Sequence, residues 1–132
     1  IRLGEDVGVV LDDRVAERVP EWHLARAEFS GGSVWVRDGG HPARVRILAR
    51  DVSIVLTPHA GTSILNTLLA VVVELADDTH PALALVKLDV GGSPLLARLT
   101  RRSAHGLGLA HGLGLAHGQR VHAQIKAVAL IG

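Results

Sequence analysis

The chain contains an internal repeat, which limits the folds open to it more than any other feature. Leu24–Phe29 and the Gly-Gly-Ser after it match Leu85–Val90 and the Gly-Gly-Ser after it. Further on, Arg44–Val52 matches Arg120–Val128. Each copy therefore has the order strand, Gly-Gly turn, strand and final β-rich strand. A repeat of whole structural units predicts two small β-structures of common ancestry rather than one irregular fold.

The two matches are offset by different numbers of residues. The first is offset by about 60 residues and the second by 76, so the second copy holds about 16 additional residues, roughly Thr100 to Leu115. Thr100 can cap a helix, and Ser103 would fall in its first turn. We therefore expect a short helix at this place in the second copy only.

Short strands with turn signals between them favour a barrel or a sandwich. The hairpin turn of the first copy is predicted at 30–32, and the loop Thr57–Gly61 is the natural boundary between the copies. The predicted fold is all-β, with two OB-like barrel halves at 1–57 and 62–132 and one short helix in the second. The alternation of apolar and polar residues predicts strands at 7–11, 14–19, 22–29, 33–37, 44–56, 66–75, 82–90, 94–99 and 121–130.

Composition excludes several classes of function. The net charge of +1, from 14 basic and 13 acidic residues, provides no long-range field to attract nucleic acid or an anionic membrane. The absence of cysteine excludes disulfides and thiolate metal sites, and it fits a reducing compartment. No apolar stretch is long enough to span a bilayer.

No glycine-rich phosphate loop ending in Lys-Ser/Thr is present, so this segment cannot hydrolyse a nucleotide by that route. Because the first residue is Ile1 rather than Met, we expect a piece of a longer polypeptide.

A low-complexity stretch duplicates six residues: Ala104–Leu109 is followed by the identical 110–115. Its histidines at 105, 111 and 117 invite a metal interpretation. On a helix, six residues turn through about 600°, so the imidazoles would share no face. On a strand they would share one face, but the interspersed glycines disfavour either element. We expect a lengthened loop that bulges from the barrel, with incidental metal affinity as the alternative, and we predict no metal site.

The polar residues that could carry chemistry are donors rather than acids. The acids are scattered on predicted turns, and no carboxylate pair, Ser-His-Asp set or helical His-Glu pair is present. A tetrahedral dianion is bound by hydroxyls, amide groups, an ammonium and backbone N–H groups, whereas a nearby carboxylate would repel it. Taken singly, Thr100 and Ser103 could be plain capping residues and Asn66 a turn residue. The donors of this kind are Thr62, Ser63, Asn66, Thr100, Ser103 and Lys126.

The second copy resembles the MOP domain, the molybdate-binding module of molbindins and of molybdate ABC-transporter ATP-binding subunits. Residues 44–56 are also similar to the segment that precedes this module in the transporter subunits, a leading half that free molbindins do not carry. The resemblance covers nearly the whole chain and is most specific at 44–75 and 119–130. The residues that carry it are Thr62-Ser-Ile-Leu-Asn66, Gly91-Gly92 with Ala97-Arg-Leu-Thr100 and Ser103, and Ala123-Gln-Ile-Lys-Ala127.

The resemblance implies an OB-like barrel that dimerises, with an oxyanion site near subunit or repeat interfaces. It implies a TOBE-like first half at 1–57 and a MOP domain at 62–132. Two positions depart from the family pattern: many relatives have Arg at the position of Leu65, and the duplicated segment follows the Thr-x-x-Ser helix directly. The residues to which the resemblance assigns molybdate binding are Ser63, Asn66, Thr100, Ser103 and Lys126.

These features predict a non-catalytic domain that binds molybdate or tungstate and uses no cofactor. Its expected partners are a second copy of the chain and, if it is fused to the parent protein, the ATPase and membrane subunits of a molybdate importer. The parent would be a molybdate-transporting ATPase, and the domain would lie in the cytoplasm or at the inner face of the cell membrane. One alternative is a structural dimerisation module with a vestigial anion site. A nucleic-acid-binding OB barrel is disfavoured, because it needs a basic groove with stacking aromatic residues.

Overall fold

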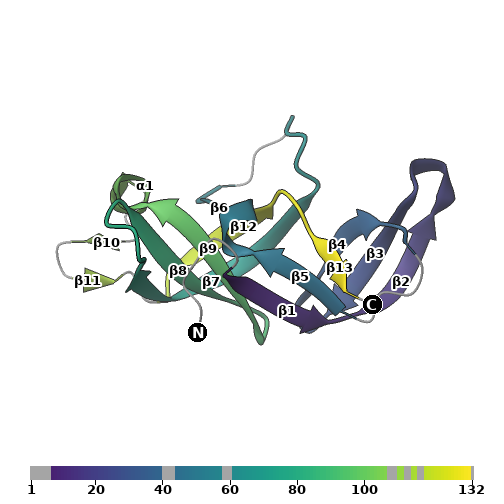
Figure 1. Ribbon diagram of the computed structural model, residues 1–132, viewed down its shortest axis with the longest axis horizontal. Helices are drawn as coiled ribbons and strands as arrows, with labels where there is room; N and C mark the ends of the chain where they lie inside the picture. The colour runs from purple at the N-terminus through teal and green to yellow at the C-terminus, as the bar shows by residue number, and fades with distance from the viewer. Residues whose placement is uncertain are drawn as a thin grey trace.

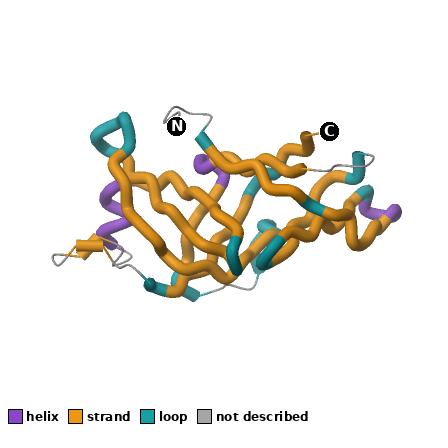
Figure 2. The backbone as a smooth tube through the Cα atoms, turned by 90° about the horizontal axis from the view of Figure 1, so that it is seen from below, coloured by secondary structure: helices purple, strands orange, loops and turns teal. Residues whose placement is uncertain are grey.

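The computed structural model describes residues 7–39, 44–57, 61–106, 110–111, 114–115 and 118–131, and strands dominate these residues (Figure 2). Three short helical turns interrupt the strands: η1 (Pro20–Trp22), η2 (Ala49–Asp51) and α1 (Arg101–Gly106). The strands are β1 (Gly8–Asp12), β2 (Arg14–Val19), β3 (Leu24–Phe29), β4 (Gly32–Arg37), β5 (Arg44–Leu48), β6 (Val52–Val55), β7 (Asn66–Asp77), β8 (Leu83–Val90), β9 (Ser93–Thr100), β10 (Ala110–His111), β11 (Gly114–Leu115), β12 (Arg120–Ile125) and β13 (Ala129–Ile131).

The last strand of each half pairs with a strand of the other half. The five-stranded sheet has the order β6-β12-β7-β8-β9, so β6 of the first half lies beside β12 of the second. In the sheet β1-β5-β13, the final strand of the second half lies beside β5 of the first. Figure 1 shows β13 running back across the molecule to reach β5. The halves predicted at 1–57 and 62–132 therefore exchange their closing strands.

The predicted strands 44–56 and 121–130 are each broken in the structure. The first is interrupted by η2, and the second ends as β12 at Ile125 before β13 begins at Ala129. Val45 and Ile47 are buried before the first break, whereas Val52 and Ile54 are buried after it. The alternation thus changes from odd to even positions, because the chain crosses from one sheet to another. Neither break contains Gly or Pro, so no local signal marks it.

The strand predicted at 22–29 begins two residues later, at Leu24. Pro20 starts a 3₁₀ turn instead, because its fixed φ suits the first helical position. The hairpin turn predicted at 30–32 is also shorter, since Phe29 pairs directly with Gly32. The turn therefore consists of two residues, Ser30 and Gly31, as does the turn Gly91-Gly92 of the second copy.

The two hairpin turns contact each other where the halves meet. Ser30 Oγ donates to the Gly91 carbonyl at 3.4 Å, and Ser93 Oγ donates to the Ser30 carbonyl. A Cβ atom added at Gly31 would lie 1.9 Å from the Val90 carbonyl oxygen. Only a residue without a side chain permits this approach, so Gly31 and Gly91 are required by packing as well as by the turn.

One hydrophobic core serves both halves. Most buried apolar residues of the first half and of the second belong to one cluster, so neither half has a separate main core. Aliphatic side chains supply this core, and the sequence contains only two Trp, one Phe and no Tyr. Its largest fully buried members are Ile47, Leu95, Ile125, Val34, Val45, Val72, Val86, Val90 and Val121.

The chain is interrupted between β1 and β2 in the first half, at Asp12 and Asp13. At the equivalent place the second half has one long strand, β7. Asp12 ends β1 opposite Arg44, whereas Asp13 lies between β1 and β2. Both carboxylate oxygens of Asp13 are buried and have no hydrogen-bond partner in the described part of the chain. Burial, and then the neighbouring charge of Asp12, raise the pKa of Asp13. The break between β1 and β2 thus places an acidic group in an unfavourable environment.

The segment that follows β9 begins with the predicted short helix, α1. Within the duplicated stretch 104–115, the described residues include a two-residue antiparallel pair, β10 with β11. The rest of the predicted bulging loop lies outside the described residues. Among the residues that the structure describes, no helix has the length and apolar character needed to cross a membrane.

A nearly buried ion pair fixes the loop after β7. Arg98 Nε lies 2.8 Å from Asp78 Oδ2, and the two side chains are only 11% and 2% exposed. Burial alone would raise the pKa of Asp78, but the hydrogen bond from the His80 backbone N–H and the contact with Arg98 outweigh burial and hold the pKa below its ordinary value. The charged form of Asp78 is therefore favoured in the folded state.

Replacing Gly31 by Ala is expected to destabilise the fold strongly. Gly31 and Gly61 both have positive φ, of 98° and 74°, but a Cβ at Gly61 would meet nothing within 4 Å. Gly31→Ala should therefore lower the free energy of unfolding by about 1–3 kcal/mol more than Gly61→Ala, the usual cost of overpacking. Urea denaturation of both variants measures the difference. Equal losses would show that the turns do not pack as described.

The Asp78 carboxylate makes stability depend on acid pH. Because its pKa is lowered on folding, its contribution is fully present above the ordinary pKa of about 3.8 and is lost as the pH falls through the lowered value. Asp78→Asn should therefore be less stable than the parent chain at neutral pH, and the two should converge in acid. Thermal unfolding from pH 7 to pH 2 tests this. Asp77→Asn is the control, since the Asp77 side chain is 87% exposed and should contribute little.

Candidate functional site

A cavity of about 540 Å³ lies where the first half meets the start and end of the second half. It collects residues from β4, from the segment before β7, and from the end of β12. Among the described residues that line it, none carries a carboxylate. The lining residues are Trp35, Ser63, Ile64, Leu65, Asn66, Ile125 and Lys126. Three of the five predicted site residues are therefore brought together here.

The segment that carries Ser63 is held by its own hydroxyl-bearing neighbour. Thr62 Oγ1 accepts a hydrogen bond from the Ile64 backbone N–H at 3.1 Å. This is the short-range turn that Ser and Thr side chains form most readily. Thr62 is therefore used to shape the turn, and Ser63 remains exposed at the cavity.

Asn66 joins the two halves through its side chain. Its Oδ1 accepts from the Trp35 backbone N–H at 2.6 Å, and its Nδ2 donates to the Trp35 carbonyl at 3.0 Å. The residue is 8% exposed, and these bonds use one acceptor site and one of the two N–H groups of its side-chain amide. Asn66 is therefore fixed in the wall of the cavity, with one amide N–H not used by Trp35.

Lys126 lies directly after β12, at the point where the chain leaves for the other half. Its backbone N–H donates to the Asp51 carbonyl at 2.8 Å, which holds this corner against η2. The side chain is exposed, and in the described part of the chain its ammonium forms no ion pair. The positive charge at the cavity is therefore not neutralised within the described residues.

Thr100 and Ser103 do not line this cavity. Thr100 Oγ1 accepts from the Ser103 backbone N–H at 3.0 Å and donates to Ser103 Oγ at 2.9 Å, which is the geometry of a helix N-cap. Figures 1 and 2 both place α1 and β4 at opposite ends of the molecule. Within one chain, the predicted set therefore divides into three residues at the cavity and two at the start of α1.

Sequence reasoning missed the apolar part of the cavity. Trp35 comes from the first half, and Ile125 and Leu65 complete the wall. The alternation around Trp35 shows that its side chain faces away from Val34 and Val36, which are buried at 0% and 3% exposure. The alternation along β4 therefore predicts which way the indole points. It does not predict that Trp35 lies beside Asn66, because these two residues belong to different copies of the repeat.

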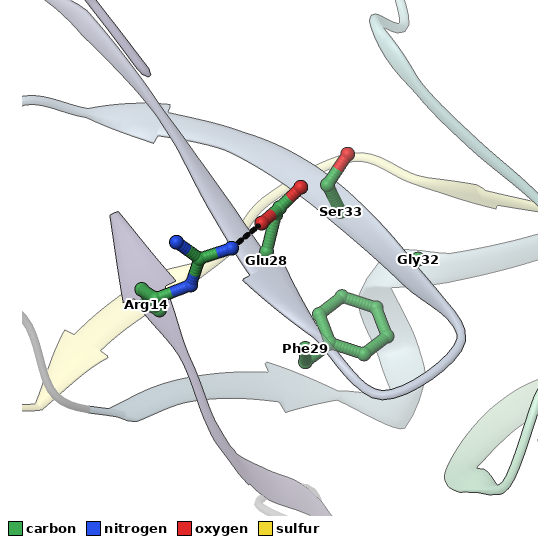
Figure 3. A pocket seen from close by; sticks show the side chains of 5 residues that line it. All are labelled: Arg14, Glu28, Phe29, Gly32 and Ser33. Carbon is green, nitrogen blue, oxygen red and sulfur yellow. Dashed lines mark hydrogen bonds and ion pairs between the residues drawn. The ribbon is translucent and has the colours of Figure 1, made fainter. Parts of the chain in front are cut away.

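A second cavity, shown in Figure 3, contains a cation that is already paired. The Arg14 guanidinium points at the Glu28 carboxylate, and Phe29, Gly32 and Ser33 complete the lining. A dianion placed here would meet the negative charge of Glu28. This cavity is therefore a poor anion site, in contrast to the one that contains Lys126.

Of the three histidines in the duplicated segment, only His105 has a described side chain, so the structure does not test whether they bind a metal together. His105 lies in α1, only the backbone of His111 is described, and His117 lies outside the described residues. In the described ranges, no group of three or more His, Cys, Asp or Glu side chains could hold a metal ion.

The chain resembles known proteins along its whole length. Residues 62–113 match the model of the TOBE domain. The chain is 65% identical to the molybdenum import ATP-binding protein ModC of Thiobacillus denitrificans over 136 residues, which cover 100% of the chain and 36% of that protein. It is 53% identical to ModC of Methylococcus capsulatus, covering 99% of the chain and 36% of that protein. The chain thus spans about one third of the length of these relatives.

A solved structure confirms the all-β fold. The cytoplasmic molybdate-binding protein ModG, in a form with molybdate bound, superposes with a TM-score of 0.63 at 20% sequence identity. The superposition covers 93% of this chain and 96% of that chain. The expected OB-like architecture with one short helix is therefore correct. The chain is therefore similar over its whole length to about one third of the molybdenum import ATP-binding proteins, and its residues 62–113 match the TOBE domain.

Proposed function

We propose that this chain is an oxyanion-binding accessory domain that takes molybdate or tungstate and regulates a molybdate importer. The observation that carries the proposal is the cavity at the junction of the halves, where Ser63, Asn66 and Lys126 meet without a carboxylate. An ammonium and a hydroxyl provide charge-assisted and neutral hydrogen bonds to such an anion. The names of the relatives and of the structural neighbour support molybdate as the ligand.

The cavity supplies one part of the donor set, and a second copy of the chain supplies the other. Thr100 ends β9 and Ser103 lies in α1, which is at the opposite end of the molecule from β4 (Figure 1), so these two residues would complete the site only from a partner. Leu65 is 65% exposed beside the cavity, which leaves apolar surface for a partner to cover. The site proposed is therefore formed by Ser63, Asn66 and Lys126 of one copy with Thr100 and Ser103 of another.

The domain acts on transport by binding rather than by catalysis. The relatives are ATP-binding proteins, and this chain corresponds to about one third of their length. The rest of such a protein would hydrolyse ATP, and this domain would report the cytoplasmic molybdate level to it. The partners proposed are a homodimer mate, the ATPase portion and the membrane subunits. Its place would be the cytoplasm, at the inner face of the cell membrane.

A structural dimerisation module with a vestigial anion site is the second candidate. It is favoured by one observation: Thr100 and Ser103 satisfy each other's hydrogen bonds as a helix cap. Leu65, at a position where the family resemblance leads us to expect Arg, leaves the site with one cation fewer. Size-exclusion chromatography separates the two candidates, because a purely structural dimer would form equally with and without molybdate.

Calorimetric titration with molybdate tests the anion site directly. Lys126→Met should weaken binding by about tenfold or more, since a hydrogen bond to a charged group contributes about 1.5–3 kcal/mol. Lys87→Met is the matched control, because Lys87 is a surface lysine already paired with Glu74 at 2.9 Å. No heat with molybdate for the folded, dimeric parent chain would remove the proposal.

Mixing two defective variants tests whether the site is shared between copies. Lys126→Met alone and Thr100→Ala/Ser103→Ala alone should each bind molybdate weakly. In a re-equilibrated mixture, some dimers combine an intact Lys126 from one copy with an intact α1 start from the other, so part of the tight binding should return. A mixture that binds no better than its components would show that the two groups do not form one site.

A further inference from the structure

Trp35 forms a wall of the cavity although it belongs to the first half, to which the family resemblance assigns no ligand residue. Val34 and Val36 on either side of it face the core, so the indole extends from the opposite face of β4. That face is the one on which the Ser63–Asn66 segment and Lys126 lie. The first half therefore contributes a surface to the proposed anion site.

The main chain of Trp35 is held by the side chain of Asn66. β4 is an edge strand of the sheet β2-β3-β4, so its outward N–H and C=O groups have no strand partner within that sheet. Asn66 bonds both groups of Trp35, at 2.6 Å and 3.0 Å, in the pattern that a neighbouring strand would provide. A nearly buried amide thus fixes the backbone that carries the indole.

Trp35 also lines a second cavity, of different polarity. The first cavity contains Ser63 and Lys126, whereas the second is an apolar cavity of about 470 Å³ lined by Val19, Trp22, Leu24, Trp35 and Leu65. The Lys126 side chain is exposed, so this apolar surface borders its cavity on one side and leaves the ammonium in contact with water. Because the Asn66 amide holds the backbone of Trp35, this wall cannot move inwards to contact an anion smaller than molybdate.

We propose that Trp35 is a specificity-determining wall of the oxyanion site and that Asn66 is the positioning residue that fixes it. The inference rests on the proposed function and extends it: the size selectivity of the site is set by the first half. Ser63 and Lys126 attract any tetrahedral dianion, whereas the fixed indole distinguishes molybdate from the smaller sulfate. Asn66 acts through Trp35 in addition to any contact that it makes with the anion.

The two tryptophans allow the wall to be observed separately from binding. The chain has two Trp and no Tyr, so Trp22→Phe leaves Trp35 as the only strong fluorophore. Trp22 is 68% exposed and does not line the anion cavity, so this change should leave molybdate affinity unaltered. Sodium molybdate should then change the emission of Trp35, and sodium sulfate should change it less.

Asn66→Ala in the Trp22→Phe background tests the positioning role. Without ligand, the emission of Trp35 should shift to the red as its backbone is released. Molybdate affinity should fall about tenfold, the scale of losing one immobilised wall, and the ratio of molybdate to sulfate affinity should fall with it. Gln124→Ala is the control, because Gln124 is an equally buried amide, 8% exposed, outside the cavity lining.

Trp35→Ala and the double variant with Asn66→Ala complete the test. Trp35→Ala should lower the molybdate-to-sulfate ratio, and Asn66→Ala should lower it no further once the indole is gone. The inference is overturned if the parent chain binds molybdate and both single variants keep its affinity and its ratio, or if bound molybdate leaves Trp35 emission unchanged. If the parent chain binds no molybdate, the proposed function itself fails, and the inference fails with it.

Discussion

The exchange of closing strands between the two halves is the interaction on which the rest of the structure depends. β12 pairs with β7 of its own half on one side and with β6 of the other half on the opposite side. This arrangement merges the two small cores into one cluster and places the end of β12 at the junction. Lys126 follows that strand, so the same exchange that stabilises the fold also delivers the cation to the cavity.

The two halves share a plan but differ in chemistry at equivalent places. Asn66 pairs in register with Ile125 in the second half, and the corresponding place in the first half brings Val7 to Ala49 through a backbone hydrogen bond of 2.9 Å. There, Val7 and Ala49 pack with Leu85 as a small apolar cluster. Among the described residues, polar donors are therefore found beside the Asn66–Ile125 pair but not beside the Val7–Ala49 contact. Both halves keep the apolar packing of the repeat, whereas only the second half has the donors.

Much of the fold could be predicted from local patterns. The two Gly-Gly hairpins, the short helix at Thr100 and most strand positions follow from periodicity and turn chemistry, which depend on near neighbours. The breaks at η2 and after Ile125 could not be placed, because a partner strand far along the sequence causes them. For the site, residue type together with the family resemblance selected Ser63, Asn66 and Lys126, which the cavity does bring together. It could not show that Thr100 and Ser103 lie at the other end of the molecule.

The sequence by itself determined that this protein is a duplicated all-β chain with an aliphatic core and a set of donors free of carboxylates. These properties depend on side-chain chemistry and on spacing along the chain. Only the tertiary structure decided which half closes which sheet, that Trp35 of the first half borders the donors of the second, and that Asn66 uses its amide to hold that indole in place. Such contacts join residues that are distant in sequence, and the energy that selects them comes from packing the whole core at once.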